Sequence, residues 1–335
     1  MVRVAVVGAG WHGQGHINTI TQIDQIELVG VCDLNENHLT KVLKKFNVPV
    51  YKNYVEMLEA TKPEGVILVT PPEVRLELVR EAAERGIHCF IEKPPARTLE
   101  EAQKVTEVIN KTGIINSVGF MYRYSKAAEK CRELLAGRSI TNVQSTMLDG
   151  IALRENWPKW FFNKGISGGP IFDQTIHIFD LSRYLLGEVE MVCGFQGNKH
   201  IQKSHDFTIE DSFSLALNYK NGPLQTHTHS WVYSGFVCQF TFVSSDMHLT
   251  LDLAEGSVRG HIDGDSISYV EEDELYKQEL EAFSKAIQEK SQEPIRSSYQ
   301  DSVESLSISL AMLEALETNK IVNVGDNKEQ VIHIP

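Results

Sequence analysis

Short apolar runs alternate with segments of helical spacing over roughly the first 120 residues. Five apolar runs rich in β-branched residues have the pattern of strands buried on both faces: 2–7, 26–32, 65–69, 87–91 and 114–118. The short run Val50-Tyr51 is a candidate for a further strand. Between them, apolar residues recur every three or four positions in the segments 73–85 and 98–111. The second of these segments opens with Thr98 and Glu101 at the spacing of a capping box. Strands that alternate with helices predict a doubly wound parallel α/β sheet.

The second half of the chain has strictly alternating apolar and polar residues instead. Segments 213–219 and 236–242 each place their large apolar side chains on one face, which predicts an antiparallel sheet covered on a single side. Asn221-Gly222 predicts a hairpin turn, although Pro223 weakens that signal. Two helices and a short strand are expected after the sheet: 273–290, 299–318 and 320–324. We therefore expect an α+β second domain with a large, mostly antiparallel, open-faced sheet.

Composition and charge exclude several classes of protein. The chain has 335 residues, enough for two domains, and its net charge of −13 disfavours general binding to nucleic acid. It has no apolar stretch long enough to cross a membrane, and its first residues lack the features of a signal peptide. The five cysteines are widely spaced and odd in number, so we expect reduced thiols in a cytoplasmic protein.

A glycine pattern follows the first predicted strand and opens a helical segment at 14–23. In this G-x-G-x-x-G, Gly8 permits a tight turn, Gly10 lets the backbone approach a pyrophosphate, and Gly13 lets helix and strand pack closely. The helix N-terminus then offers N–H groups to the phosphates. We expect a dinucleotide-binding Rossmann domain over 1–121 and a substrate-binding and oligomerisation domain over 122–335. The alternative is a glycine turn in a fold of this kind that binds no nucleotide.

The residues around Asp33 predict NAD rather than NADP as the cofactor. Asp33 ends the second strand 20 residues after Gly13, where a carboxylate accepts hydrogen bonds from the adenosine ribose. No Arg or Lys follows in the segment 34–36 to neutralise a 2′-phosphate, and Asp33 itself repels one. NADP is therefore the less favoured cofactor.

Two further segments place reactive side chains where chemistry is expected. Lys93, in Glu92-Lys93-Pro94, lies at the C-terminal end of the fifth strand, the edge at which open α/β sheets bind ligands. In the second segment, Asp173, His177 and Asp180 are spaced to share one face of a helix that opens after Gly-Gly-Pro. An Asp one turn before a His can orient the imidazole. The alternatives are a solvated lysine, a capping Asp and a core His.

Together these residues resemble the Gfo/Idh/MocA oxidoreductase family, the group of glucose–fructose oxidoreductase and inositol dehydrogenase. The resemblance covers nearly the whole chain, and beyond the motifs above it includes the following residues: His16, Thr70-Pro71-Pro72, Val118-Gly119-Phe120, Arg123-Tyr124, Phe283, Ala286 and Ile287. It implies an NAD(P)-dependent dehydrogenase that oxidises a secondary alcohol of a sugar, glycoside or inositol.

The resemblance also implies roles for individual residues. It assigns catalysis to Lys93, Asp173 and His177; His177 is our first choice as general base, although Lys93 and His177 could exchange roles. Cofactor contacts are expected from Gly8, Gly10, Trp11, His12, Gly13, Asp33, Thr70, Pro71, Glu92 and Lys93. Substrate contacts are expected from Lys93, Tyr122, Arg123, Arg154, Trp160, Asp173 and His177, with Trp157, Lys159 and Asp180 nearby. Ordinary packing is the alternative for the aromatic residues.

Three positions depart from the family's pattern. Pro170 replaces the third glycine of a glycine run, and Thr175 replaces the glycine between Asp and His. The His that often follows the Pro-Pro turn corresponds here to Arg75 or has no counterpart. Separately, His227 and His229 face one side of a predicted strand. We expect a solvated or interface pair there, rather than a substrate contact or a metal site, and we predict no metal.

Two rival functions and the oligomeric state stay open. An NAD-dependent glycoside hydrolase has a similar architecture, and a non-catalytic dinucleotide sensor could share this fold. In the family the open face of the C-terminal sheet commonly forms dimers or tetramers, so we expect a homodimer or homotetramer.

Overall fold

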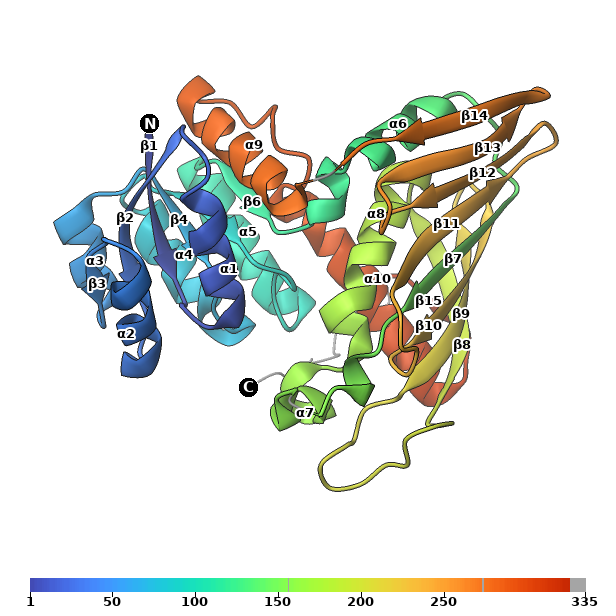
Figure 1. The fold of residues 1–335 in the computed structure, drawn as a ribbon, viewed down its shortest axis with the longest axis horizontal. Helices are drawn as coiled ribbons and strands as arrows, with labels where there is room; N and C mark the ends of the chain where they lie inside the picture. Colours follow the sequence, from blue (N-terminus) through green and yellow to red (C-terminus); the bar gives the residue numbers. More distant parts are fainter. Residues whose placement is uncertain (156, 273, 326–335) are drawn as a thin grey trace. The chain divides into compact units, whose positions relative to one another are not determined.

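The computed structural model describes residues 1–155, 157–272 and 274–325, which divide into two compact units. Unit 1 comprises 1–121 and 274–303, and unit 2 comprises the described residues of 122–273 and 304–335 (Figure 1). The sequence led us to expect all of 122–335 in one domain. The segment 274–303 instead belongs to unit 1, because Phe283 and other apolar residues of its helix are part of the buried core of that unit.

Unit 1 is built on a six-stranded sheet in which every neighbouring pair is parallel. The strands are β1 (Val2–Val7), β2 (Ile26–Cys32), β3 (Val50–Tyr51), β4 (Gly65–Leu68), β5 (His88–Ile91) and β6 (Asn116–Val118). Their order, β3-β2-β1-β4-β5-β6, is that of a doubly wound dinucleotide-binding sheet. The predicted fold class of this half is confirmed.

Helices cover both faces of this sheet (Figure 1). They are α1 (Trp11–Ile20), α2 (Glu36–Lys45), α3 (Tyr54–Thr61), α4 (Arg75–Ala83), α5 (Leu99–Thr112) and α9 (Leu275–Glu289). Ile17 of α1, Val42 of α2 and Phe283 of α9 share one buried cluster with the strands. The predicted cap of α5 is confirmed, since the side chain of Thr98 accepts a hydrogen bond from the backbone N–H of Glu101.

Unit 2 is built on a nine-stranded sheet of order β14-β13-β12-β11-β7-β10-β9-β8-β15. Its strands are β7 (Asn142–Leu148), β8 (Val189–Gly197), β9 (Ser212–Tyr219), β10 (Leu224–Ser230), β11 (Val237–Val243), β12 (Met247–Asp252), β13 (Ser257–Ile262), β14 (Asp265–Val270) and β15 (Val322–Asn323). Every neighbouring pair is antiparallel except β7 and β10. The expected hairpin joins β9 to β10 around Asn221-Gly222.

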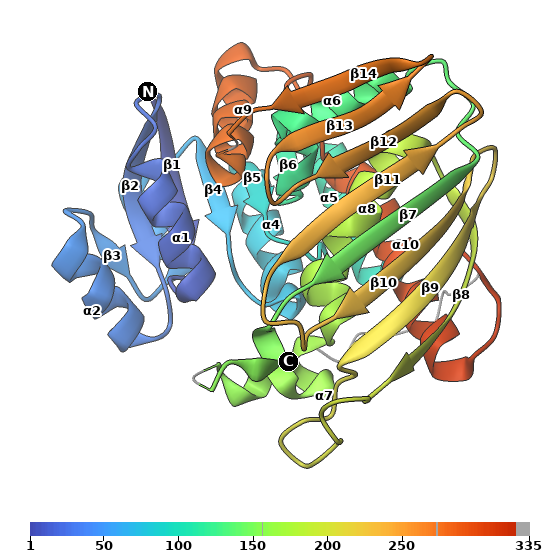
Figure 2. The ribbon, with the colours of Figure 1, turned by 45° about the vertical axis from the view of Figure 1, so that its right-hand side comes forward.

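One face of this sheet is packed and the other is open. The helices of unit 2 are α6 (Lys126–Leu135), α7 (Lys164–Ser167), α8 (Ile176–Leu186) and most of α10 (Tyr299–Thr318), whose residues up to Val303 belong to unit 1. Within unit 2, α8 and α10 lie behind the sheet as Figure 2 shows it. Buried and exposed residues alternate along β9 and β10, as expected for a sheet covered on one side. Among the residues described, no helix combines the length and apolar character that crossing a bilayer requires.

Candidate active site

The glycine loop after β1 is shaped so that side chains are excluded at two of its three glycines. Gly8 has a φ of +94°, and a Cβ there would lie 2.4 Å from the carbonyl oxygen of Val69. A Cβ on Gly13 would lie 1.9 Å from the carbonyl oxygen of Gly8, so helix and loop pack backbone to backbone. At Gly10 the nearest atom to a Cβ is 3.9 Å away, on His38, and the loop is open to an approaching group.

The N-terminus of α1 is arranged to receive an anion. Gly10 is the N-cap and provides no side-chain hydrogen bond, and the first turn of the helix contains no acidic residue. The helix dipole therefore favours negative charge at this end, with no acidic side chain in the first turn to oppose it. Together with the open space over Gly10, this end fits the pyrophosphate of a dinucleotide. Trp11, which opens the helix, is 77% exposed.

The carboxylate of Asp33 is fixed at the end of β2. Its Oδ2 accepts a hydrogen bond from the backbone N–H of Ala9 at 2.6 Å and lies 3.0 Å from Nδ1 of His38, while its Oδ1 accepts from Asn35 N–H at 2.7 Å. A carboxylate oxygen accepts about two hydrogen bonds, so Oδ1 keeps capacity for a ribose hydroxyl. His38 was not singled out from the sequence. The signal for it was its place in the first turn of the helix that follows Asp33.

Beside the glycine loop, the hydroxyl of Thr70 lacks a partner. Thr70 Oγ1 is buried and has no hydrogen bond within the described part of the chain. The backbone N of Thr70 lies 3.5 Å from the position of a Cβ on Gly8, so this residue borders the loop. Since buried polar groups are nearly always paired, the orphaned hydroxyl fits a ligand that supplies the missing partner.

Glu92, at the end of β5, holds the backbone of Lys93. Its Oε1 lies 2.6 Å from Nε2 of buried His16, and its Oε2 accepts a hydrogen bond from Lys93 N–H at 3.0 Å. Burial opposes ionisation of this carboxyl, but the hydrogen bond from His16 and the nearby positive charges outweigh burial and hold the pKa of Glu92 well below its usual range. An ionised Glu92 therefore fixes the start of the loop that carries Lys93.

The second motif lies in unit 2 on an irregular turn. Residues Ile171–Thr175 form a π-helical turn, in which Ile176 N–H donates to the carbonyl oxygen of Ile171, five residues earlier. The spacing of Asp173 and His177 had predicted a regular α-helix through both, and the structure corrects this. His177 is 9% exposed and lies edge-on to the ring of Tyr122, with 5.8 Å between the ring centres. π-Turns are frequent at functional sites because they change how successive side chains project.

Arg123 and Asp180, both expected near the substrate, are engaged with each other. Two nitrogens of Arg123 donate to the two oxygens of Asp180, each at 2.7 Å, and the hydroxyl of Ser305 also donates to Asp180 at 2.7 Å. The two residues are only 2% and 1% exposed. This buried, bidentate pair joins η2 (Met121–Tyr124) to α8, so the geometry favours a positioning role for Arg123 over a direct contact with substrate.

Arg154 and Trp160 are more accessible. Arg154 donates to Oδ1 of Asp149 at 2.8 Å, and its side chain is 49% exposed. Oδ2 of Asp149 accepts a hydrogen bond at 3.0 Å from Gln174, the neighbour of Asp173. Arg154 is thereby linked to the π-turn within unit 2. Trp160 is 53% exposed and therefore open to a ligand or to solvent.

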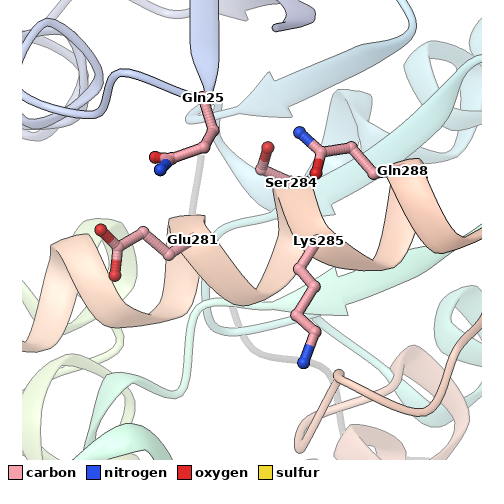
Figure 3. Close-up of a pocket in the computed structure, with 5 residues that line it drawn as sticks. All are labelled: Gln25, Glu281, Ser284, Lys285 and Gln288. Carbon is pink, nitrogen blue, oxygen red and sulfur yellow. The ribbon is translucent and has the colours of Figure 1, made fainter.

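A separate hollow of about 370 Å³ lies elsewhere in unit 1. It is lined by Gln25, just before β2, and by four residues of α9: Glu281, Ser284, Lys285 and Gln288 (Figure 3). Gln25 lies at the N-terminal end of the parallel strands, whereas the glycine loop and Lys93 follow their C-terminal ends. The hollow therefore lies at the opposite edge of the sheet from the glycine loop and Lys93.

Two stretches of the chain match models of a known protein family. Residues 2–120 match an oxidoreductase family with an NAD-binding Rossmann fold, and residues 129–257 match the GFO/IDH/MocA C-terminal domain. The chain is 31% identical over 238 residues to the D-glucoside 3-dehydrogenase of Escherichia coli (strain K12), which covers 66% of this chain and 68% of that protein. The chain belongs to the Gfo/Idh/MocA oxidoreductase family. The resemblance seen in the motifs is thus confirmed.

Other members of the Gfo/Idh/MocA family are similar over different lengths. The scyllo-inositol 2-dehydrogenase (NAD(+)) of Bacillus subtilis (strain 168) is 34% identical over 197 residues, 58% of this chain. That match spans 56%, little more than half, of the relative's length. A solved levoglucosan dehydrogenase in complex with NADH has a TM-score of 0.85 at 20% identity, over 96% of this chain and 99% of that chain. The latter likeness shows the shared fold.

The two histidines of β10 are buried and hydrogen-bonded, one of them to Thr175. His229 is fully buried, and its Nδ1 lies 3.1 Å from Oγ1 of Thr175, while Nδ1 of His227 lies 2.9 Å from Oγ of Ser145. Burial lowers the pKa of His227 to about 3 and that of His229 well below its usual value. The expected solvated or interface pair was wrong, since these are neutral core histidines.

Proposed function

We propose that this protein is an NAD-dependent dehydrogenase that oxidises a secondary alcohol of a sugar, glycoside or inositol. The observation that carries the proposal is that a chain matched by both domain models of the family keeps the reactive Lys93, Asp173 and His177. The names of two relatives, an inositol dehydrogenase and a glucoside dehydrogenase, support the substrate class.

The cofactor proposed is NAD, held by the residues expected from the sequence. The N–H groups at the start of α1 and the space over Gly10 fit the pyrophosphate, and Oδ1 of Asp33 fits a ribose hydroxyl. The orphaned hydroxyl of Thr70 fits a further polar group of the cofactor. When bound, NAD supplies the hydride acceptor of the reaction. The negative charge of Asp33 supports NAD over NADP.

In this proposal the chain's own residues move the proton and hold the reacting oxygen. His177 removes the hydroxyl proton, and Asp173 orients its imidazole. Lys93 donates a hydrogen bond to the reacting oxygen and stabilises the negative charge that develops there. The assignment in which Lys93 is the base and His177 the donor stays open. Tyr122, Arg154 and Trp160 are proposed to contact the substrate ring, with Arg123 holding η2 in place.

The test is a turnover assay on purified protein. NAD or NADP is mixed with a panel of inositols, aldoses, sugar phosphates and glycosides, and reduced nicotinamide is followed by absorbance. We expect NADH with one substrate class and its loss in Lys93→Met and in His177→Asn. A matched control is Lys104→Met, because Lys104 is exposed and pairs with Glu100 on the surface of α5. Unchanged turnover in both site variants would contradict the assigned roles.

The two rival functions give different products in the same assay. Release of an aglycone from a glycoside without net NADH identifies the hydrolase. Tight binding of NAD with no turnover of any substrate, and unchanged binding in His177→Asn, identifies the sensor.

The assembly and location are proposed from the same family. The open face of the nine-stranded sheet is proposed to form a homodimer or homotetramer, supported by exposed Phe195 and Leu224 on β8 and β10. Light scattering with Phe195→Lys tests this, with a smaller mass expected for the variant. A cytoplasmic location stays a prediction, supported by five cysteines that are all free thiols.

A further inference from the structure

We propose that Arg75 is a positioning residue that clamps the loop carrying Lys93. The proposal that this improves catalysis rests on the proposed dehydrogenase function, but the clamp itself can be measured without turnover. Arg75 opens α4 and is only 3% exposed. Its buried side chain reaches backbone carbonyls of two different loops, and these contacts carry the proposal.

The guanidinium of Arg75 joins the loops that follow two neighbouring strands. Its Nε and Nη2 donate to the carbonyl oxygen of Thr70 at 3.1 and 2.6 Å, in the loop after β4. Its Nη1 donates to the carbonyl oxygens of Glu92 and Pro94, in the loop after β5. Those two carbonyls belong to the residues directly before and after Lys93. One side chain therefore holds the backbone on both sides of the reactive lysine.

Two other contacts complete the hold on this loop. The hydroxyl of Tyr299 donates to the carbonyl oxygen of Pro95 at 3.1 Å. The carboxylate of Glu92 accepts from the backbone N–H of Lys93. Arg75 also ties this loop to its neighbour, since it donates to the carbonyl oxygen of Thr70. Loss of Arg75 would therefore loosen the loop after β5 from the loop after β4.

An arginine is suited to this position by its shape and its charge. Its planar fork carries five N–H donors, whereas an imidazole carries two at most and an ammonium group donates from a single atom. Burial lowers the pKa of Arg75 to about 10, with the nearby charge of Glu92 acting in the opposite direction. The group therefore stays positively charged at neutral pH and keeps all its donors.

Hydrogen exchange is the direct test of the clamp. The N–H of Lys93 is measured by exchange and mass spectrometry on peptides covering 88–97 in the wild-type chain, Arg75→Met and Arg75→Lys. We expect roughly tenfold faster exchange in Arg75→Met and an intermediate rate in Arg75→Lys, which keeps a donor. The matched control is Arg80→Met, because Arg80 lies on the same helix and pairs with Glu77 at the surface. An exchange rate in Arg75→Met equal to that of the wild-type chain would show that Arg75 does not hold this loop.

A double-mutant cycle separates positioning from general stability. We expect kcat to fall about 100-fold in Arg75→Met, because a small displacement of a reacting group has effects of that size. In a Lys93→Arg background, which keeps a cation and is expected to keep residual turnover, Arg75→Met should have little further effect on kcat, whereas the kcat losses from independent structural damage would multiply. If the two substitutions lower kcat by the product of their separate effects, the positioning role of Arg75 is overturned. If the wild-type chain turns over no substrate, the proposed function fails while the exchange experiment still decides the clamp. If Arg75→Met fails to fold, Arg75→Lys carries both measurements.

Discussion

Thr175 Oγ1 lies 3.1 Å from Nδ1 of His229, and this buried hydrogen bond ties the π-turn of unit 2 to its sheet. Thr175 is fully buried in the π-turn, two residues from both Asp173 and His177. A glycine at this position would have no side chain to make the bond. The hydroxyl of Thr175 therefore anchors the π-turn between Asp173 and His177.

Thr175→Val should destabilise the protein by about 1–3 kcal/mol, because valine keeps the shape and leaves Nδ1 of His229 without its partner. The measurement is urea unfolding at pH 7. Thr228→Val is the matched control, since Thr228 lies on the exposed face of β10, the strand that carries His229. This substitution should change stability by under about 0.5 kcal/mol. Equal effects of the two substitutions would show that the hydrogen bond contributes nothing.

Stability should fall as the pH is lowered from neutral, because of the histidines on β10. The pKa of His227 is lowered to about 3 by burial, so the folded chain keeps this ring neutral while the unfolded chain protonates it. Its contribution is full above the unfolded value of about 6.5 and declines by about 1.4 kcal/mol per pH unit until pH nears 3. Unfolding midpoints at pH 7, 6 and 5 measure this slope.

Replacing His227 by a residue that does not titrate separates its contribution to the pH dependence of stability from that of other titrating groups. His227→Gln keeps a donor and acceptor but cannot titrate, so the slope between pH 6 and 5 should become shallower by about one proton. His248→Gln is the control, because His248 is exposed on β12 and its replacement should leave the slope unchanged. An identical slope in His227→Gln would contradict the assignment.

Glu279→Gln should stabilise the protein at neutral pH. Glu279 is fully buried on α9, and neither carboxylate oxygen has a hydrogen bond among the described residues. Burial, followed by the negative charge of Glu92, raises the pKa of Glu279 well above its usual value. A carboxyl whose pKa is raised in the folded state costs no stability below its unfolded pKa of about 4.5. As the pH rises above that value, the carboxyl increasingly destabilises the folded state.

The expected gain for Glu279→Gln is therefore more than about 1 kcal/mol at pH 7 and near zero at pH 4. Thermal and urea unfolding at the two pH values measure it. Glu281→Gln on the same helix is the control, since Glu281 is exposed and should show no such pH-dependent gain. Destabilisation of Glu279→Gln at pH 7 would show instead that the carboxylate has a favourable partner.

The elements of the fold could be predicted because their signals are local. The β-branched run at 26–32 and the apolar period of 299–318 correspond to β2 and α10 residue for residue. The packing of α9 against unit 1 could not be predicted, because the apolar pattern of a helix does not identify the hydrophobic core to which it belongs. The π-turn at Ile171–Thr175 was missed because Asp173 and His177 keep the spacing of an α-helix.

The contacts that position the reactive residues join points far apart in the sequence. His16 and Glu92 are separated by 76 residues, and Thr175 and His229 by 54. No local period links such pairs, since each depends on which strands become neighbours and on the register between them. The residue types at the site were therefore predictable, whereas their partners were not. Arg75 was noticed as a departure from the family's pattern, but its three carbonyl partners required the structure.

Asp33→Asn should weaken the preference for NAD over NADP. The amide keeps an oxygen to accept from Ala9 N–H, so the loop is expected to hold its shape while the negative charge that repels a 2′-phosphate disappears. His38, 3.0 Å from the carboxylate, then faces that phosphate position as a donor. We expect the ratio of the two dissociation constants to shift about 10-fold towards NADPH, equivalent to about 1.4 kcal/mol.

Fluorescence titration of NADH and NADPH measures both constants without any turnover. Glu36→Gln is the matched control, because this nearby carboxylate is exposed and paired with Lys52, so its loss should leave the ratio unchanged. Adding His38→Ala to Asp33→Asn should remove part of the gain in NADPH binding, because the imidazole lies 3.0 Å from the substituted carboxylate. If Asp33→Asn leaves the ratio at its wild-type value, the preference must arise elsewhere than at the end of β2.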